Sequence, residues 1–257
     1  MMPDQETIST LDPSYDTDVD YRSYWTARSY EHRAEVMALS RLLRGRRFRH
    51  AVDVGGGYGR LSAVLSEYAD RVTLTDPSYR QLEVAEGYLE RHPGIERRRM
   101  DAAHLDFADA SVDLAVMVRV LHHLPDPRPE LSEIARILET GGYAVIEAAN
   151  VGHAVNRVRY WSKGQKVPTA PVDIRSAANK VNGSIPFVNH HPGAIAGLLA
   201  SCGLTVERVL SVSNLRQPGL KRLMPERVML AAEYAMQATL APVSFGPSLF
   251  FLARKPA

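Results

Sequence analysis

Strand-length segments alternate with helical patterns along most of this sequence. The segments 51–54, 71–76, 96–100, 111–118, 143–149 and 204–212 have the length of strands, and apolar residues recur at helical spacing over 30–43, 79–90, 130–138 and 189–202. The segment 111–118 is nearly all apolar, which is typical of a central parallel strand covered on both faces. This order predicts an α/β fold with a doubly wound sheet.

Two stretches, 150–191 and 213–245, are too long for simple crossovers, and we expect them to form a cap at one rim of the sheet. The first is basic and aromatic and contains one acid, Asp173. Its side chains could meet an anionic or planar substrate, meet an RNA stem, or form a solvated surface. The second carries an apolar helix face that predicts packing on the cap or core, with a homodimer contact as the alternative.

Composition sets the remaining limits. The chain has 257 residues, 45% of them hydrophobic, and a net charge of +2, which gives no argument for nucleic acid. The single cysteine, Cys202, excludes an internal disulfide and favours the cytoplasm. We expect a tail over 1–20 and one domain over 21–257, with no signal peptide and no membrane association.

The segment from Ala51 to Ser62 predicts a strand, a tight turn and a helix, with glycines at 55, 57 and 59. Such a turn at the carboxyl end of a strand binds nucleotide-like ligands. The dinucleotide pattern G-x-G-x-x-G fails, because Arg60 or Ser62 stands at its third glycine, and the Gly-Lys-Ser/Thr of a P-loop is absent.

Two acidic residues close the following strands. Asp76 lies about 20 residues beyond the glycines, where a carboxylate can accept both ribose hydroxyls. Asp101 ends the third strand, before the small residues Ala102 and Ala103. The alternative for each acid is a helix cap.

The pattern Asp53-x-Gly-x-Gly-x-Gly, taken with Asp76, Asp101 and Leu121-His-His-Leu124, resembles the class I methyltransferases that use S-adenosylmethionine (SAM), including the quinone C-methyltransferases. The resemblance covers about 21–210 and the last strand. It implies a Rossmann-like, seven-stranded sheet with an antiparallel last strand. It also implies SAM as the cofactor, held at Asp53, Gly55, Gly57, Asp76, Asp101, Ala102 and Arg119. Asp53 would face the methionine end, and Asp101 the adenine amino group.

An aromatic segment from Tyr21 to Glu35 precedes the sheet, and we expect a lid over 21–45. The resemblance adds Tyr24, Arg28 and Tyr30 to the cofactor site, with Arg28 gripping the SAM carboxylate. An aromatic staple that packs a helix on the core is the alternative, and the two are compatible.

Histidines are the candidates for a general base, because imidazole titrates near neutral pH. His122 and His123 follow the fourth strand, and His190 and His191 precede a helix that faces the acceptor in related sequences. Of these we select His122, His123 and His191. No pattern of metal ligands is visible, so metal-independent chemistry is expected.

These observations predict methyl transfer from SAM to an O, N or C nucleophile of a small molecule. Three alternatives stay open: an RNA methyltransferase, a SAM-binding enzyme that catalyses a cyclisation or rearrangement, and a non-catalytic SAM sensor. The first lacks an appended RNA-binding module and an Asn-Pro-Pro-Tyr signature, since Arg119-Val-Leu-His stands after the fourth strand.

Overall fold

A computed structural model describes residue 25 and residues 28–182 and 184–256 of the chain. The predicted tail over 1–20 and the candidate Tyr24 lie outside the described residues.

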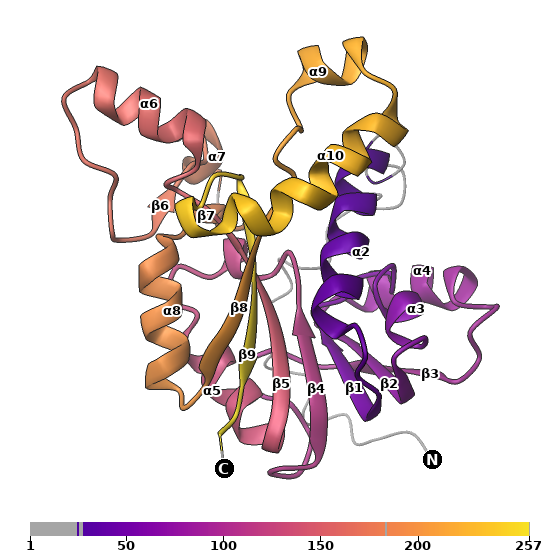
Figure 1. The fold of residues 1–257 in the computed structure, drawn as a ribbon. Coiled ribbons are helices and arrows are strands. Elements are labelled where there is room, and N and C mark those ends of the chain that lie inside the picture. Colours follow the sequence, from indigo (N-terminus) through magenta and orange to yellow (C-terminus); the bar gives the residue numbers. More distant parts are fainter. Residues whose placement is uncertain (1–24, 26–27, 183, 257) are drawn as a thin grey trace.

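A single seven-stranded sheet runs through the middle of the molecule (Figure 1). Its order is β3-β2-β1-β4-β5-β9-β8. The strands are β1 (Phe48–Val54), β2 (Ala69–Asp76), β3 (Ile95–Arg99), β4 (Val112–Met117), β5 (Leu138–Ala149), β8 (Thr205–Val212) and β9 (Ser248–Arg254). The first five pair in parallel, and β9 lies antiparallel between β5 and β8. The predicted fold, including the antiparallel last strand, is confirmed.

Helices cover both faces of the sheet (Figure 1). On one face lie α2 (Ser29–Leu43), the single turn α3 (Ser62–Leu65) and α4 (Tyr79–Tyr88); on the other lie α5 (Arg128–Ile137) and α8 (Pro192–Ser201). A hydrophobic core lies on each face of the sheet. Side chains alternate along each strand, so Ala51 of β1 packs in one core and Val52 in the other. The two cores explain why the central strands are apolar throughout.

The two long insertions form separate arms beyond the carboxyl ends of the parallel strands (Figure 1). The first holds α6 (Ala154–Ser162), β6 (Val172–Asp173), α7 (Ala177–Val181) and β7 (Val188–Asn189). The second holds α9 (Pro218–Leu223), α10 (Glu226–Thr239) and the 3₁₀ turn η4 (Ala241–Val243), and α10 packs on α2. Another 3₁₀ turn, η3 (Leu121–His123), follows β4.

Strand β5 begins at Leu138, five residues before the predicted start at 143. The strand continues through the glycine pair 141–142. The pairing of β4 with β5 shifts register between Val112 and Leu114, and Gly141 adopts a φ of +85°. A bulge therefore accommodates the glycines inside the strand.

Candidate active site

The glycine turn begins directly after β1. Gly55 and Gly57 have φ values of +66° and +59°, a region that favours glycine. A Cβ on Gly55 would lie 2.4 Å from a methyl group of Val120, so this glycine lets the segment after β4 pack closely. A Cβ on Gly57 would meet only Gln81, at 3.9 Å. The missing side chain of Gly57 therefore leaves open space beside the turn.

That space belongs to a cavity of about 390 Å³ at the carboxyl ends of the parallel strands. It lies at β1 and β4, where the strand order reverses, and open α/β sheets bind ligands at this point. Its lining brings together six predicted cofactor residues and two predicted bases: Gly55, Gly57, Asp76, Asp101, Ala102, Arg119, His122 and His123.

Asp76 holds the turn from the end of β2. Its Oδ2 accepts a hydrogen bond from the Gly57 amide at 2.8 Å, and its Oδ1 accepts one from the Ser78 amide at 2.9 Å. Ser78, and not Asp76, caps α4, because its hydroxyl accepts the Gln81 amide at 3.2 Å. Ser78 thus fills the capping role that was the alternative for Asp76. Asp76 itself lines the cavity.

Asp101 and Ala102 follow β3 at the same rim. The Asp101 carboxylate accepts the Ala103 amide at 3.0 Å, which fixes a tight turn. Both residues line the cavity beside Glu130 of α5. Glu130 is buried, one of its oxygens has no hydrogen-bond partner among the described residues, and burial raises its pKa.

Two arginines at the cavity share one buried carboxylate. Arg60 and Arg119, here called the arginine pair, both bond to Glu35 of α2. Burial would raise the pKa of Glu35, but the two guanidinium charges outweigh it and hold that pKa below its usual range. The ring of Trp25 lies over the pair, 3.8 Å from Arg60 and 5.6 Å from Arg119 measured from guanidinium carbon to ring centroid. The cluster keeps one net positive charge at the cavity.

Arg119 is held by its backbone as well. Its φ is +66°, which is uncommon for a residue with a side chain. Its amide donates to Glu147 at 3.1 Å, and Glu147 in turn accepts the hydroxyl of Ser248. Strand β9 thereby fixes the segment that carries Arg119 and His122.

His122 is 6% exposed and packs against two rings. Its centroid lies 4.0 Å from that of His123 and 4.6 Å from that of Phe187. Burial, with the nearby charges of His123 and Arg119, holds the pKa of His122 well below its usual range. Its Nδ1 has no hydrogen-bond partner among the described residues. The site therefore contains a neutral imidazole whose Nδ1 is buried.

His123 also lines the cavity, and its Nδ1 lies 3.0 Å from the carbonyl oxygen of Pro186. Burial lowers the pKa of His123, although the Pro186 bond opposes the shift. This contact ties η3 to the first arm, which supplies Ile185 and Phe187 to the cavity wall.

Asp53 lies beneath the glycine turn and is not among the lining residues. It is fully buried, accepts the Ser62 hydroxyl at 2.6 Å, and burial raises its pKa to about 6. A Cβ on Gly56 would come within 2.6 Å of the Asp53 carboxylate. In the structure Asp53 supports the turn from below, and its contact with the methionine end stays a prediction.

Tyr30, Arg28 and His191 also lie outside the lining that the structure describes. Tyr30 is buried between α2 and the second arm, where its hydroxyl donates to Glu233 at 2.7 Å. Arg28 is the N-cap position of α2. His191 caps α8, since its Nδ1 accepts the Gly193 amide at 3.2 Å. Neighbouring His190 is buried, with Nε2 2.9 Å from the Leu121 carbonyl oxygen.

The staple interpretation of the N-terminal segment thus applies to one residue and the lid interpretation to another. Tyr30 is the staple, while Trp25 lines the cavity. Sequence reasoning missed Arg60, Glu35 and Phe187. The spacing of Glu35 could have indicated burial, because Glu35 stands four residues before Leu39 on the buried face of a helix. No sequence pattern could have placed Phe187 in the site, because the path of the long insertion does not follow from its sequence.

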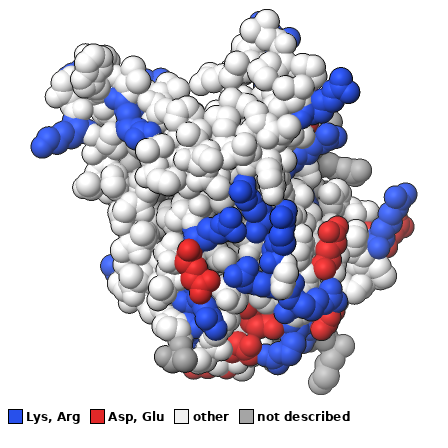
Figure 2. Space-filling view, in the orientation of Figure 1, with Lys and Arg blue, Asp and Glu red and all other residues white. Residues whose placement is uncertain are grey.

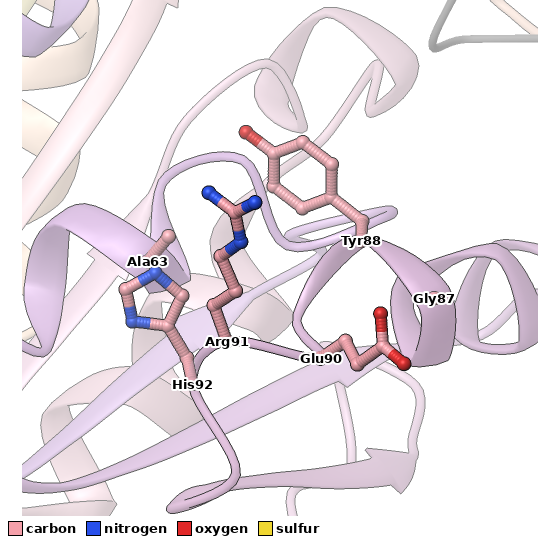
Figure 3. Close-up of a pocket in the computed structure, with 6 residues that line it drawn as sticks. All are labelled: Ala63, Gly87, Tyr88, Glu90, Arg91 and His92. Carbon is pink, nitrogen blue, oxygen red and sulfur yellow. The ribbon is translucent and has the colours of Figure 1, made fainter.

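A second cavity of about 390 Å³ lies beside α4 (Figure 3). Ala63, Gly87, Tyr88, Glu90, Arg91 and His92 line it. It adjoins the connection that enters β3, at the amino ends of the parallel strands. A doubly wound sheet binds its ligand at the opposite, carboxyl ends, so we assign the site to the cavity of Asp76 and His122.

A Rossmann-like sheet with a glycine turn and an acidic residue closing β2 defines a class of proteins that bind adenosine-containing cofactors. Residues 52–146, from β1 to β5, match the family model described as a methyltransferase domain. The SAM-dependent methyltransferase structure from Thermotoga maritima has the same fold, with a TM-score of 0.62, 18% identity, and coverage of 92% of this chain and 95% of that one.

Two curated relatives are similar over the sheet. The O-methyltransferase cnsE of Penicillium expansum is 36% identical over 48% of this chain and 48% of its own length. The ubiquinone/menaquinone biosynthesis C-methyltransferase UbiE of Rubrivivax gelatinosus is 29% identical over 54% of this chain and 52% of its own. The chain spans about half the length of these relatives. The matched segment 52–146 is that of a methyltransferase domain, and the fold is that of SAM-dependent methyltransferases, which implies SAM as the cofactor.

Proposed function

We propose that this protein transfers the methyl group of SAM to an oxygen, nitrogen or carbon nucleophile of a small molecule. The observation that carries the proposal is one cavity that joins Gly57, Asp76 and Asp101 to the neutral imidazole of His122. We place the reaction in small-molecule biosynthesis in the cytoplasm, because the only cysteine, Cys202, is a free thiol.

The lining fits the parts of the cofactor. Asp76 would accept the ribose hydroxyls, and Asp101 would accept the adenine amino group beside the small residue Ala102. The net positive charge of the arginine pair suits the carboxylate of the methionine end. This role replaces the one predicted for Arg28. Asp53, with its pKa of about 6, supports from below the glycine turn that contains Gly57.

Bound SAM supplies a methyl group activated by positive sulfur. The chain's own contribution is to position the acceptor and to exclude water, which can supply much of the rate enhancement. Phe187, Ile185 and Leu124 give the acceptor an apolar wall. The imidazole of His122, which lines the cavity, would accept the proton of a phenol or carbon acid as the nucleophile forms its new bond. Because its pKa is depressed, His122 is unprotonated at neutral pH, which is the form that a general base requires.

The test measures formation of S-adenosylhomocysteine with the purified protein, SAM and a panel of phenols, carbon acids and pyridines. We expect turnover on at least one acceptor. His122→Gln should lower transfer to a phenol by about 100-fold or more, since a general base contributes that much. The same variant should leave transfer to a pyridine nitrogen unchanged, because that acceptor has no proton to lose.

Equal losses on the phenol and the pyridine would show that His122 only shapes the pocket. Turnover of an acceptor without S-adenosylhomocysteine would instead favour the cyclisation or rearrangement alternative. Activity confined to RNA and lost with rising salt would favour the nucleic-acid alternative.

A further inference from the structure

Helix α6 in the first arm turns its apolar side away from the protein. Val155, Val158 and Trp161 are spaced three residues apart and share one face of the helix. All three are exposed, Val158 to 64% and Trp161 to 80%. The polar Asn156 points back instead, and its amide donates to the Val151 carbonyl at 2.9 Å. The helix is amphipathic with its apolar face in solvent, so it lacks the partner that such a face requires.

Cations border this apolar face. Arg157 and Arg159 lie on its two sides, and Lys163 and Lys166 follow the helix. All four are exposed. The one acid of the arm, Asp173, is bound to Arg175 and Lys180 at a distance from this face along the chain. Figure 2 shows Lys and Arg over the α6 arm, and no acidic side chain there on the face in view.

The positive field extends to the base of the helix. His153 precedes α6, and burial together with the charges of Arg216, Arg159 and Arg157 lowers its pKa to about 4. An anionic partner would therefore be attracted to the whole arm.

The shape of the arm favours a lipid surface over a folded protein. α6 projects from the sheet as a narrow arm (Figure 1). Its apolar face is one short helix of nine residues, whereas a stable protein interface needs about 800 Å² on each partner. An apolar stripe with a tryptophan and flanking cations is what lies in the headgroup layer of anionic bilayers. No helix in the described ranges is long and apolar enough to cross a bilayer, so contact would be peripheral.

From this arrangement we infer that α6 docks the protein on an anionic membrane, with Val155, Val158 and Trp161 in the headgroup layer and Arg157 and Arg159 on the lipid phosphates. The sequence alone predicted no membrane contact, because it did not show which face of α6 is exposed. The same arm supplies Ile185 and Phe187 to the cavity, so docking brings the acceptor wall to the lipid. This inference does not depend on methyl transfer.

The test is co-sedimentation of the full chain with vesicles of phosphatidylcholine alone or with one-third phosphatidylglycerol. We expect binding to the anionic vesicles at low salt and loss of it in 0.5 M NaCl or on neutral vesicles. Val158→Glu and Arg157→Glu/Arg159→Glu should each lower the partition coefficient by about tenfold or more. None of the α6 side chains is buried, so these variants should keep the native circular dichroism spectrum.

The matched control is Val84→Glu on α4, which changes an exposed valine on a different surface and should bind like the wild type. Protein that stays in the supernatant with anionic vesicles would overturn the inference, as would equal losses for Val84→Glu and Val158→Glu. A wild-type dimer in light scattering that Val158→Glu converts to a monomer would assign α6 to self-association instead.

Discussion

Asp53 is a buried carboxyl group whose protonation affects the stability of the glycine turn. Burial raises its pKa to about 6, and the Ser62 hydroxyl only partly opposes this. The folded protein therefore binds a proton at Asp53 over a pH range in which the unfolded chain has released it. The stabilisation from this proton is complete below the unfolded pKa and is lost as pH rises through about 6.

Replacing Asp53 with Asn removes this titration. We expect wild type to gain about 1.4 kcal/mol of unfolding free energy relative to Asp53→Asn when pH falls from 7.5 to 5. Urea unfolding of both proteins at the two pH values measures the difference. A difference that stays constant with pH, or grows toward alkaline pH, would show that Asp53 is ionised in the folded protein throughout this range.

At the scale of elements, the contact between α2 and α10 holds the second arm on the body. Glu233 of α10 is fully buried and accepts the Tyr30 hydroxyl at 2.7 Å and the amides of Ser213 and Asn214 at 2.8 and 2.9 Å. Burial raises the pKa of Glu233. A buried carboxyl group depends on each of these donors, so the network makes Tyr30 a structural residue.

Tyr30→Phe removes one donor from Glu233 and should lower the unfolding free energy by about 1–3 kcal/mol. Tyr234→Phe is the control on the same helix, because Tyr234 is exposed and its loss should cost no more than about 0.5 kcal/mol. SAM affinity should be the same in both variants. If Tyr30→Phe weakened SAM binding more than tenfold while stability stayed unchanged, Tyr30 would belong to the cofactor site after all.

At the scale of the whole molecule, the order of strands and helices along the chain could be predicted, because each element has a local sequence pattern. β4 is apolar throughout, and β1 ends at glycines. The place of β9 between β5 and β8 came from the family resemblance, since no local pattern gives strand order. The rim residues Asp76, Asp101 and His122 could also be predicted, because parallel strands deliver their carboxyl ends to one edge.

The rest of the site depends on long-range placement. Phe187 and Ile185 reach the cavity from an insertion whose path the sequence does not specify, and Arg60 meets Glu35 only once α2 has packed on the sheet. Asp53 and Tyr30 were placed in the site by resemblance, but both are buried behind it. Sequence spacing gives the edge of the sheet where a residue lies and leaves open which way its side chain points.

The cavity at Gly57, Asp76 and His122 is the place where we expect SAM to bind. We would test this by isothermal titration of the purified protein with SAM and, separately, with NAD. We expect micromolar SAM binding and no NAD binding. Gly57→Leu should abolish the SAM signal, because the new side chain enters the cavity.

Gly45→Leu is the matched control, since Gly45 also has a positive φ, of +75°, and a Cβ there meets nothing within 4 Å. It should impose similar backbone strain and keep wild-type affinity. NAD binding in place of SAM, or unchanged SAM affinity in Gly57→Leu, would contradict the account.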